Sequence, residues 1–127
     1  MKILHICYSD LDGGAARAAY RLHRAQRKIG LDSKMLVVYK MSDDPHVFAV
    51  SKLTKLRIKI LNFIQDKKYD YLFVLHGEGI SENFLSKIKS LNRNIISIMY
   101  QWDSIIHYNY VHLIPLFNKV FTFDNVD

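Results

Sequence analysis

The sequence has one cysteine, no long apolar run and no secretory leader pattern. Cys7 cannot form a disulfide within the chain, which fits a reducing cytoplasm, and its place in an apolar run predicts a small core residue. No uninterrupted apolar stretch approaches the ~20 residues of a membrane span. Polar and charged residues follow the first apolar run within a few positions, unlike the pattern of a signal peptide. We therefore expect a cytoplasmic protein.

Several functional patterns are also missing. Neither GxGxxG nor GxxxxGK[ST] occurs, so neither common nucleotide fingerprint is met. His107 and His112 are five residues apart with no acid between them, so we expect no metal site. No Ser-His-Asp or Cys-His arrangement can be assembled, and we predict no cofactor. Internal repeats and low-complexity tracts are absent as well.

The composition is that of one folded, basic domain. The chain has 127 residues, half of them hydrophobic, which suits a single domain with a real core. Its formal net charge is +6 and its pI is about 9.4. Such a charge favours anionic partners, namely nucleotides, phospholipid headgroups or nucleic acid; the alternative is a solvated basic surface.

The first thirty residues read as a buried strand, a glycine loop and a helix. Lys2 to Tyr8 is an apolar run with little alternation, typical of a parallel strand covered on both faces. Ser9 to Gly14 has turn chemistry, and Gly30 is in the position of a helix C-terminal glycine. A helix that starts after a glycine loop offers N–H groups and a positive dipole end to an anion, although Gly13-Gly14 alone also fits a simple tight turn. One apolar helical stripe is predicted between the loop and Gly30: Ala15, Ala18, Leu22, Ala25 and Ile29.

Strand and helix patterns alternate along the rest of the chain. Further strands are predicted over 33–39, 69–76, 94–101 and 119–124, with a weaker extended piece at 46–51. Helices are predicted over 52–68, 82–91 (with Ser81 as N-cap and Leu91 facing inward) and 105–117, where Pro115 disturbs the last. This alternation predicts an α/β, Rossmann-like three-layer sandwich with a mainly parallel sheet of order 3-2-1-4-5 or a close variant, and Lys2 to Tyr8 at its centre.

Ligands of such sheets bind beyond the carboxyl ends of the strands. The informative residues should therefore be the strand exits, at residues 9–14, 76–79, 101–104 and 124–127. Arg17 could reach a phosphate from its place near the start of the first helix, whereas Arg21, Arg24 and Lys28 are expected on a solvated face.

The string from Asp10 to Val37, DLDGGAARAAYRLHRAQRKIGLDSKMLV, resembles the N-terminal opening of GT-B glycosyltransferases, and is closest to the bacterial family-four type of polysaccharide biosynthesis. The resemblance implies the N-terminal, acceptor-side half of a GT-B architecture over 1–127, without the C-terminal donor domain. It also implies that Gly13 and Gly14 lie at the cleft between two Rossmann-like domains, near the sugar-nucleotide diphosphate.

Residues 69–124 resemble a second group of polysaccharide-biosynthesis glycosyltransferases, through the segments Gly77-Glu78-Gly79, Trp102-Asp103-Ser104 and Phe123-Asp124. His76, Gly77, Glu78 and Gly79 are substrate-binding candidates, because glycines allow close approach and Glu78 can accept hydrogen bonds from sugar hydroxyls. The alternative is a βα turn with an exposed acid.

Asp103 is the candidate catalytic base, with Trp102 able to stack on a sugar face or to shield the carboxylate from water. The alternative is that Asp103 caps the following helix and Trp102 packs in the core. His107 belongs to a polar-aromatic cluster that fits the edge of a cleft or ordinary surface packing.

The resemblance implies sugar transfer from a nucleotide sugar to a lipid-linked or polysaccharide acceptor. Its chemistry would stabilise the leaving diphosphate with cations and helix dipoles. An acidic donor-domain motif is missing, so the activity would need a C-terminal donor domain or a partner subunit. The alternative functions are a non-catalytic anion- or nucleotide-binding module and, ranked last, a nucleic-acid binder, which we do not expect.

The predicted helix at 52–68 also suits the surface of an anionic membrane, because apolar residues on one face accompany six basic residues and one acid. This predicts peripheral contact on the inner face of the membrane. The alternative is that its apolar face packs on the sheet and leaves only the charges outside.

Overall fold

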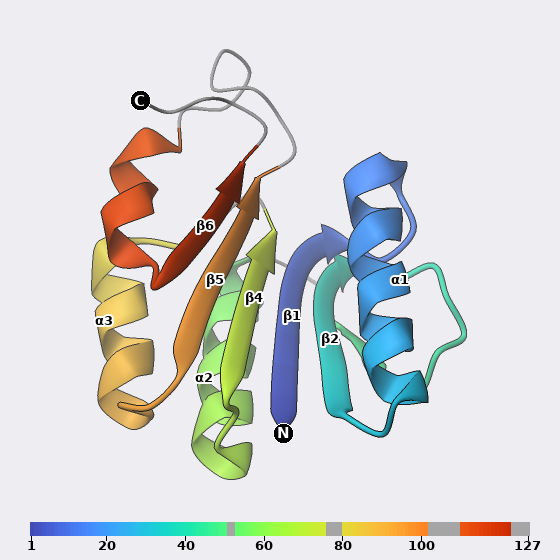
Figure 1. The fold of residues 1–127 in the computed structure, drawn as a ribbon, viewed down its shortest axis with the longest axis horizontal. Helices are drawn as coiled ribbons and strands as arrows, with labels where there is room; N and C mark the ends of the chain where they lie inside the picture. The colour runs from blue at the N-terminus through green and yellow to red at the C-terminus, as the bar shows by residue number, and fades with distance from the viewer. Residues whose placement is uncertain (51–52, 76–79, 102–109, 123–127) are drawn as a thin grey trace.

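The computed structural model of the chain describes residues 1–50, 53–75, 80–101 and 110–122. Within them lies one sheet of six strands, all parallel, in the order β3-β2-β1-β4-β5-β6 (Figure 1). The strands are β1 (Lys2–Ser9), β2 (Asp32–Tyr39), β3 (Val47–Ala49), β4 (Tyr71–Leu75), β5 (Ile96–Gln101) and β6 (Lys119–Thr122). The helices are α1 (Gly13–Lys28), α2 (Leu53–Lys67), α3 (Glu82–Leu91) and the 3-10 helix η1 (Val111–Leu116).

β1 is central, as predicted. It pairs with β2 from Lys2 opposite Asp32 onwards and with β4 from Ile3 opposite Tyr71 onwards. Its apolar side chains are buried on both faces of the sheet, which is why the sequence shows a continuous apolar run rather than an alternating one.

The short β3 completes the expected order. The weakly predicted piece at 46–51 is the third strand and pairs with β2, with Met35 opposite Val47. The strand predicted at 69–76 is therefore the fourth, and it lies beside β1. It begins two residues later than predicted, at Tyr71, and Tyr69 is a buried core residue before it.

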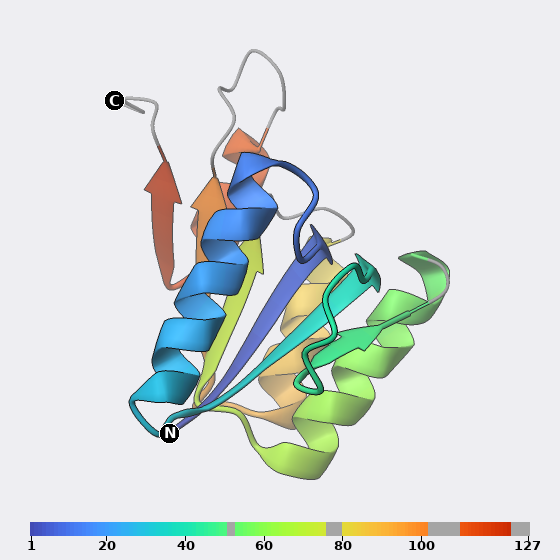
Figure 2. The same ribbon diagram turned by 90° about the vertical axis from the view of Figure 1, so that its right-hand side faces the viewer.

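The helices are divided unequally between the two faces of the sheet. Of the described helices, α1 alone lies on one face, while α2, α3 and η1 lie on the other (Figures 1 and 2). Right-handed crossovers explain this division. The β1–β2 connection crosses the sheet in one direction, whereas the connections to β4, β5 and β6 all run in the opposite direction.

Each face has its own apolar core. The larger core packs α2, α3 and η1 on the sheet, around side chains such as Leu4, Ile60, Leu72 and Ile88. The smaller one lies on the α1 face and contains Cys7, Met35, Val37, Val47 and Leu75. The prediction that Cys7 is a core residue is confirmed, since only 4% of it is exposed.

Only part of the apolar stripe predicted on α1 faces the core under the helix, where Ala15 packs. The buried residues of α1 are Ala16, His23 and Gln26, while Leu22 and Ile29 of the stripe are 43% and 75% exposed. The helix is therefore rotated relative to its own apolar stripe, because polar side chains under it make hydrogen bonds to the sheet. Gly30 follows the helix with φ +85 and donates its N–H to the Arg27 carbonyl, as expected of a C-terminal glycine.

α3 begins as predicted, because the Ser81 hydroxyl accepts a hydrogen bond from the Phe84 N–H at 3.3 Å. Phe84, Leu85 and Ile88 are buried, but the prediction that Leu91 faces inward is wrong, since it is 41% exposed at the last residue of the helix. The helix predicted at 105–117 is described only from Tyr110 onwards. It is the 3-10 helix η1, with Pro115 inside it.

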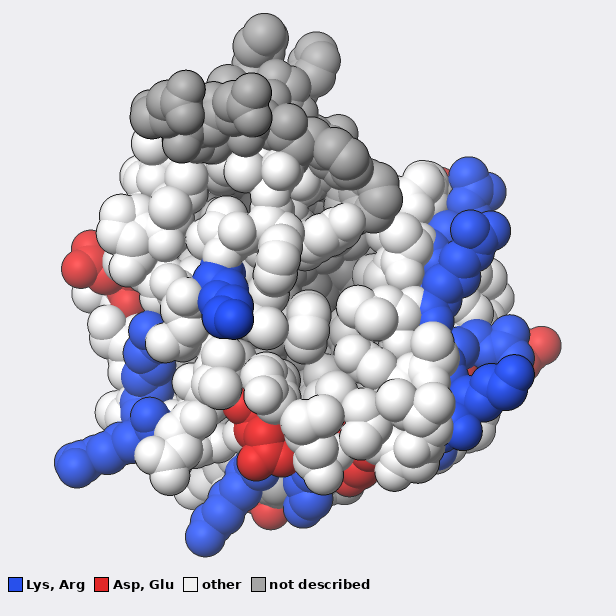
Figure 3. Space-filling model, in the orientation of Figure 1, with Lys and Arg blue, Asp and Glu red and all other residues white. Residues whose placement is uncertain are grey.

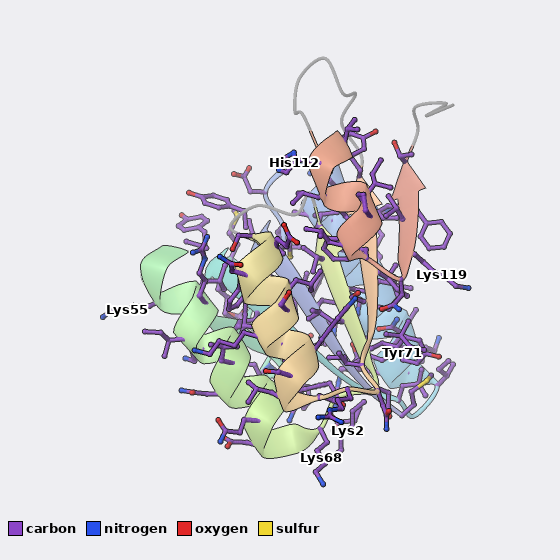
Figure 4. The ribbon with its side chains drawn as sticks, turned by 90° about the vertical axis from the view of Figure 1, so that its left-hand side faces the viewer. Lys2, Lys55, Lys68, Tyr71, His112 and Lys119 are labelled. Carbon is purple, nitrogen blue, oxygen red and sulfur yellow. The ribbon has the colours of Figure 1, made fainter. Side chains whose placement is uncertain are left out.

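α2 buries its apolar face in the core, as the alternative to membrane contact predicted. Leu56, Ile60 and Ile64 pack there and are at most 4% exposed. Its exposed side includes Lys55 and Arg57, and Lys55 points away from the sheet in Figure 4. In the described part of the chain, no helix has the length and apolar character needed to cross a membrane.

Candidate functional site

The carboxyl ends of β1, β2, β4 and β5 meet at one edge of the sheet, where α1 also begins (Figure 1). The loop from β1 to α1 is held by Ser9, which is 2% exposed. Its hydroxyl accepts hydrogen bonds from the N–H groups of Leu11 and Asp12 at 3.3 and 3.1 Å. The turn expected at residues 9–14 is therefore stabilised by the hydroxyl of one buried serine.

Asp10 ties this loop to the loop that follows β2. Its carboxylate is fully buried and accepts hydrogen bonds from the N–H groups of Met41 and Ser42 at 2.8 and 2.9 Å. Burial raises the pKa of Asp10, but the hydrogen bonds from Ser42 and Met41 outweigh it, so the pKa lies below its ordinary value. Asp10 is thus an ionised residue that positions two loops. The sequence did not predict this role, because Asp10 lies in a run of turn residues and looked like one of them.

Gly13 and Gly14 open α1 and are exposed. Gly13 has φ +86, while Gly14 has an ordinary helical backbone, and a Cβ built on either would meet nothing within 4 Å. The N-cap residue Asp12 makes no side-chain hydrogen bond to the helix, and the first turn has no acid. Open space beside both glycines and a first turn with no capping side chain and no acid suit an anion at the positive end of the helix dipole.

Arg17 is the fifth residue of α1 and is exposed. Among the described residues it has no hydrogen bond or ion pair, so it is available to a ligand. Arg21, Arg24 and Lys28 are exposed too, as predicted for a solvated face, and basic side chains gather over α1 at the right of Figure 3.

Seven predicted site residues lie outside the described residues: His76, Gly77, Glu78, Gly79, Trp102, Asp103 and His107. The strands that precede them, β4 and β5, end at Leu75 and Gln101 on the same edge as β1. Their roles therefore stay predictions. In the part of the chain that the structure describes, no group of three or more His, Cys, Asp or Glu side chains could hold a metal ion.

A buried polar cluster under α1 was not predicted. His5 Nε2 donates to Gln26 Oε1 at 2.7 Å, and the Ser33 hydroxyl donates to the same oxygen at 2.9 Å. His23 Nδ1 is 2.8 Å from the Ser33 hydroxyl, and its Nε2 is 3.7 Å from the Asp44 carboxylate. The signal in the sequence was the spacing of His23 and Gln26, which places both on one helix face, together with a histidine inside an apolar strand.

Burial controls the titration of both histidines. It lowers the pKa of His5 to about 4, with Gln26 opposing the shift and His23 adding to it. Burial also lowers the pKa of His23, against the attraction of the Asp44 carboxylate. Both rings are therefore neutral near pH 7, and the cluster works as a hydrogen-bonded connection between α1 and the sheet rather than as a charged site.

No protein-family model matches the sequence, and no curated protein matches it. Solved structures do match the fold. An alpha-glucosyltransferase in complex with UDP and a 13-mer DNA containing an HMU base aligns over 96% of this chain with a TM-score of 0.64 and 18% identity. An alpha-glucosyltransferase in complex with UDP aligns over 94% with a TM-score of 0.65 and 14% identity.

The chain shares its fold with a part of each of these two structures. The Rossmann-like α/β architecture expected from the sequence is thereby confirmed. The chain spans about a third of the length of these two structures, 36% and 34%. At such low identity the likeness concerns the glycosyltransferase fold, and it does not extend to the family-four type within it.

Proposed function

We propose that this chain is a glycosyltransferase domain that supplies one wall of a site for sugar transfer from a nucleotide sugar. The observation that carries the proposal is the glycine loop at the start of α1. It presents the first N–H groups of α1, which no capping side chain among the described residues engages, at the carboxyl edge of the sheet, in a fold shared with two glucosyltransferases solved with UDP. The physical role of this loop is to bind an anionic group, which in a nucleotide sugar is the diphosphate.

In this proposal the other predicted residues complete the wall. Arg17 adds a cation beside the diphosphate as the bond to the sugar breaks. Asp103 accepts the proton of the acceptor hydroxyl, with Trp102 and His107 at the edge of the cleft. The segment from His76 to Gly79 binds sugar hydroxyls. The remaining donor contacts come from a C-terminal donor domain or a partner subunit.

The proposed acceptor is a lipid-linked or polysaccharide glycan of the cell surface, as the sequence resemblances imply. Peripheral contact with anionic membrane would bring the domain to such an acceptor, and the exposed basic side of α2 supports this location.

A nucleic-acid acceptor is the second candidate. It is favoured by the DNA in one structural neighbour and by the exposed basic residues of α1, although no nucleic acid was expected from the sequence. A non-catalytic anion-binding module remains the alternative to both.

The test is a titration of the ¹⁵N-labelled chain followed by NMR, with UDP, inorganic pyrophosphate and uridine as ligands. UDP and pyrophosphate should shift the amides of Gly13, Gly14 and Ala15, because these N–H groups face the anion. Uridine, which lacks phosphate, should leave these three amides unchanged. Shifts confined to other residues, or none at all with UDP, would contradict the role of this loop.

A further inference from the structure

One part of the sheet has no covering helix among the described residues. On the face that carries α1, the side chains of β4, β5 and β6 line a hollow of about 500 Å³. Figure 3 shows the hollow as a surface of uncharged side chains beside α1. Apart from Lys119, the residues of these three strands that line the hollow are aromatic or aliphatic, and they include Phe73, Leu75, Ile98, Tyr100 and Phe121. Phe121 is 50% exposed, so part of this apolar surface is open to solvent.

The topology explains why the described helices leave this hollow open. Right-handed crossovers that run from β3 to β4, β5 and β6 place their helices on the opposite face, where α2, α3 and η1 lie (Figure 2). The β1–β2 and β2–β3 connections run in the other direction, and α1, the helix between β1 and β2, covers these two strands. Because sheets of parallel strands are ordinarily covered on both faces, the surface over β4 to β6 lacks one layer.

α1 forms the second wall of the hollow. Ala18 and Leu22, from the apolar stripe that the sequence predicts, line it, and Leu22 is 43% exposed. These two residues of the stripe therefore line the hollow and do not pack in the core under α1. This part of the stripe turns small and aliphatic side chains towards the open sheet, so the two walls meet at an angle and form a groove. We call this surface the α1–β6 groove.

A single cation, Lys119, lies among the described residues that line the groove. It is exposed and has no hydrogen bond or ion pair within the described part of the chain. Figure 4 shows Lys119 and Tyr71 pointing away from α3 and η1, towards the α1 side of the sheet. An apolar groove with one unpaired cation at its border favours an apolar partner that also carries an acid.

We propose that the α1–β6 groove binds an amphipathic α-helix of a polypeptide outside residues 1–127. Apolar side chains of this helix would pack on Phe121, Tyr100 and the α1 stripe, and an acidic side chain would pair with Lys119. Three neighbouring strands span about 10 Å, which matches the diameter of one helix. The formal net charge of +6 disfavours a second copy of this chain as the occupant. The proposal is independent of the proposed sugar transfer.

The test selects partners for the purified chain from a display library of randomised 18-residue helical peptides. Selected peptides should share an apolar stripe with a neighbouring Glu or Asp. Their affinity, measured by fluorescence anisotropy, should fall at least tenfold for Leu22→Asp and for Phe121→Asp. Lys119→Glu should weaken the acidic peptides and favour versions in which Lys replaces the acid. Ile58→Asp is the matched control, because Ile58 is 62% exposed on α2, on the opposite face.

Circular dichroism of each variant checks that the fold is kept, which is expected because all four substituted side chains are exposed. The proposal is overturned if no helical peptide is selected, or if selected peptides bind Leu22→Asp and Phe121→Asp as well as the unchanged chain. It is also overturned if the chain sediments as a dimer that Leu22→Asp dissociates, since the groove would then hold a second copy. Displacement of the peptide by fatty acid at equal concentration would assign the groove to a lipid chain instead.

Discussion

Gly13 and Gly14 are adjacent, yet they meet different constraints. Gly13 has φ +86, a region that side chains with a Cβ rarely adopt, whereas Gly14 has no such restriction. Space is open beside both glycines. A larger side chain at residue 14 therefore tests whether a ligand binds beside the loop. A larger side chain at residue 13 tests how much stability depends on the positive φ of the backbone.

We expect Gly14→Val to change the free energy of unfolding by no more than about 0.5 kcal/mol, as for an exposed site without special geometry. Gly13→Val should destabilise the chain by about 1–2 kcal/mol through its backbone conformation. In the NMR titration, Gly14→Val should abolish UDP binding because its methyl groups fill the proposed anion site. Unchanged UDP affinity in folded Gly14→Val would leave the loop as a turn only. Urea unfolding provides the stability measurement.

His5 is the residue for which burial has the clearest consequence in solution. Its pKa in the folded chain is about 4, against an ordinary value of 6.5. The unfolded chain therefore binds the proton more tightly, and the stability from neutral His5 is present above pH 6.5 and lost as the pH falls towards 4. A shift of this size corresponds to about 3 kcal/mol.

We predict that the free energy of unfolding falls between pH 6.5 and 4, measured by urea unfolding at several pH values. His5→Gln should be less stable at pH 7 but should lose less stability over the same interval, because it does not titrate. The lowered pKa of His23 acts in the same direction and remains in both proteins. Parallel pH profiles for the two proteins would show that His5 titrates normally.

Among the elements, α3 has the best-defined start. Ser81 caps it, and Glu82 in the first turn adds a favourable charge at the positive end of the dipole. Ser81→Ala should lower the free energy of unfolding by about 1 kcal/mol. Ser90→Ala is the matched control, because its exposed hydroxyl donates only to the Lys87 carbonyl within the helix, and it should change little. Equal effects of the two substitutions in urea unfolding would contradict the capping role.

Only the charged side of α2 can contact a membrane, because its apolar face is buried in the core. We therefore predict weak binding to anionic vesicles that is lost at raised salt, since screening removes the attraction of about 1 kcal/mol for each basic residue near the surface. Co-sedimentation with and without phosphatidylglycerol, at low and raised salt, measures it. Replacing Lys55 and Arg57 by glutamine should weaken binding, and equally negligible binding to neutral and anionic vesicles would exclude a membrane role.

For the whole molecule, the fold spans about a third of the glucosyltransferases that it resembles. Under the proposed function, one wall of the transfer site is insufficient, because the leaving diphosphate needs contacts from a second domain. We expect residues 1–127 alone to release no UDP from UDP-glucose when a glycan or DNA acceptor is added. A coupled assay for UDP measures this, and sustained turnover by residues 1–127 would contradict the need for a second domain.

The sequence by itself determined the architecture. A continuous apolar run marked β1 as central, and strands alternating with helices implied parallel pairing, because both signals come from local periodicity and burial. The glycine loop, the Ser81 cap and the terminal Gly30 followed from backbone chemistry in the same way. These features need only residues that are close together in the chain.

Tertiary structure decided which surface each helix face meets. The stripe containing Ala18 and Leu22 looked like the core side of α1. Instead, the hydrogen bonds that join Gln26 to His5 of β1 and His23 to Ser33 of β2 place a polar face of the helix on the sheet. Asp10 likewise finds its partners thirty-one and thirty-two residues away, at Met41 and Ser42. Such pairings depend on which segments the sheet brings together, so the spacing of residues in the sequence could not predict them. The open groove over β4 to β6 follows from the direction of the crossovers.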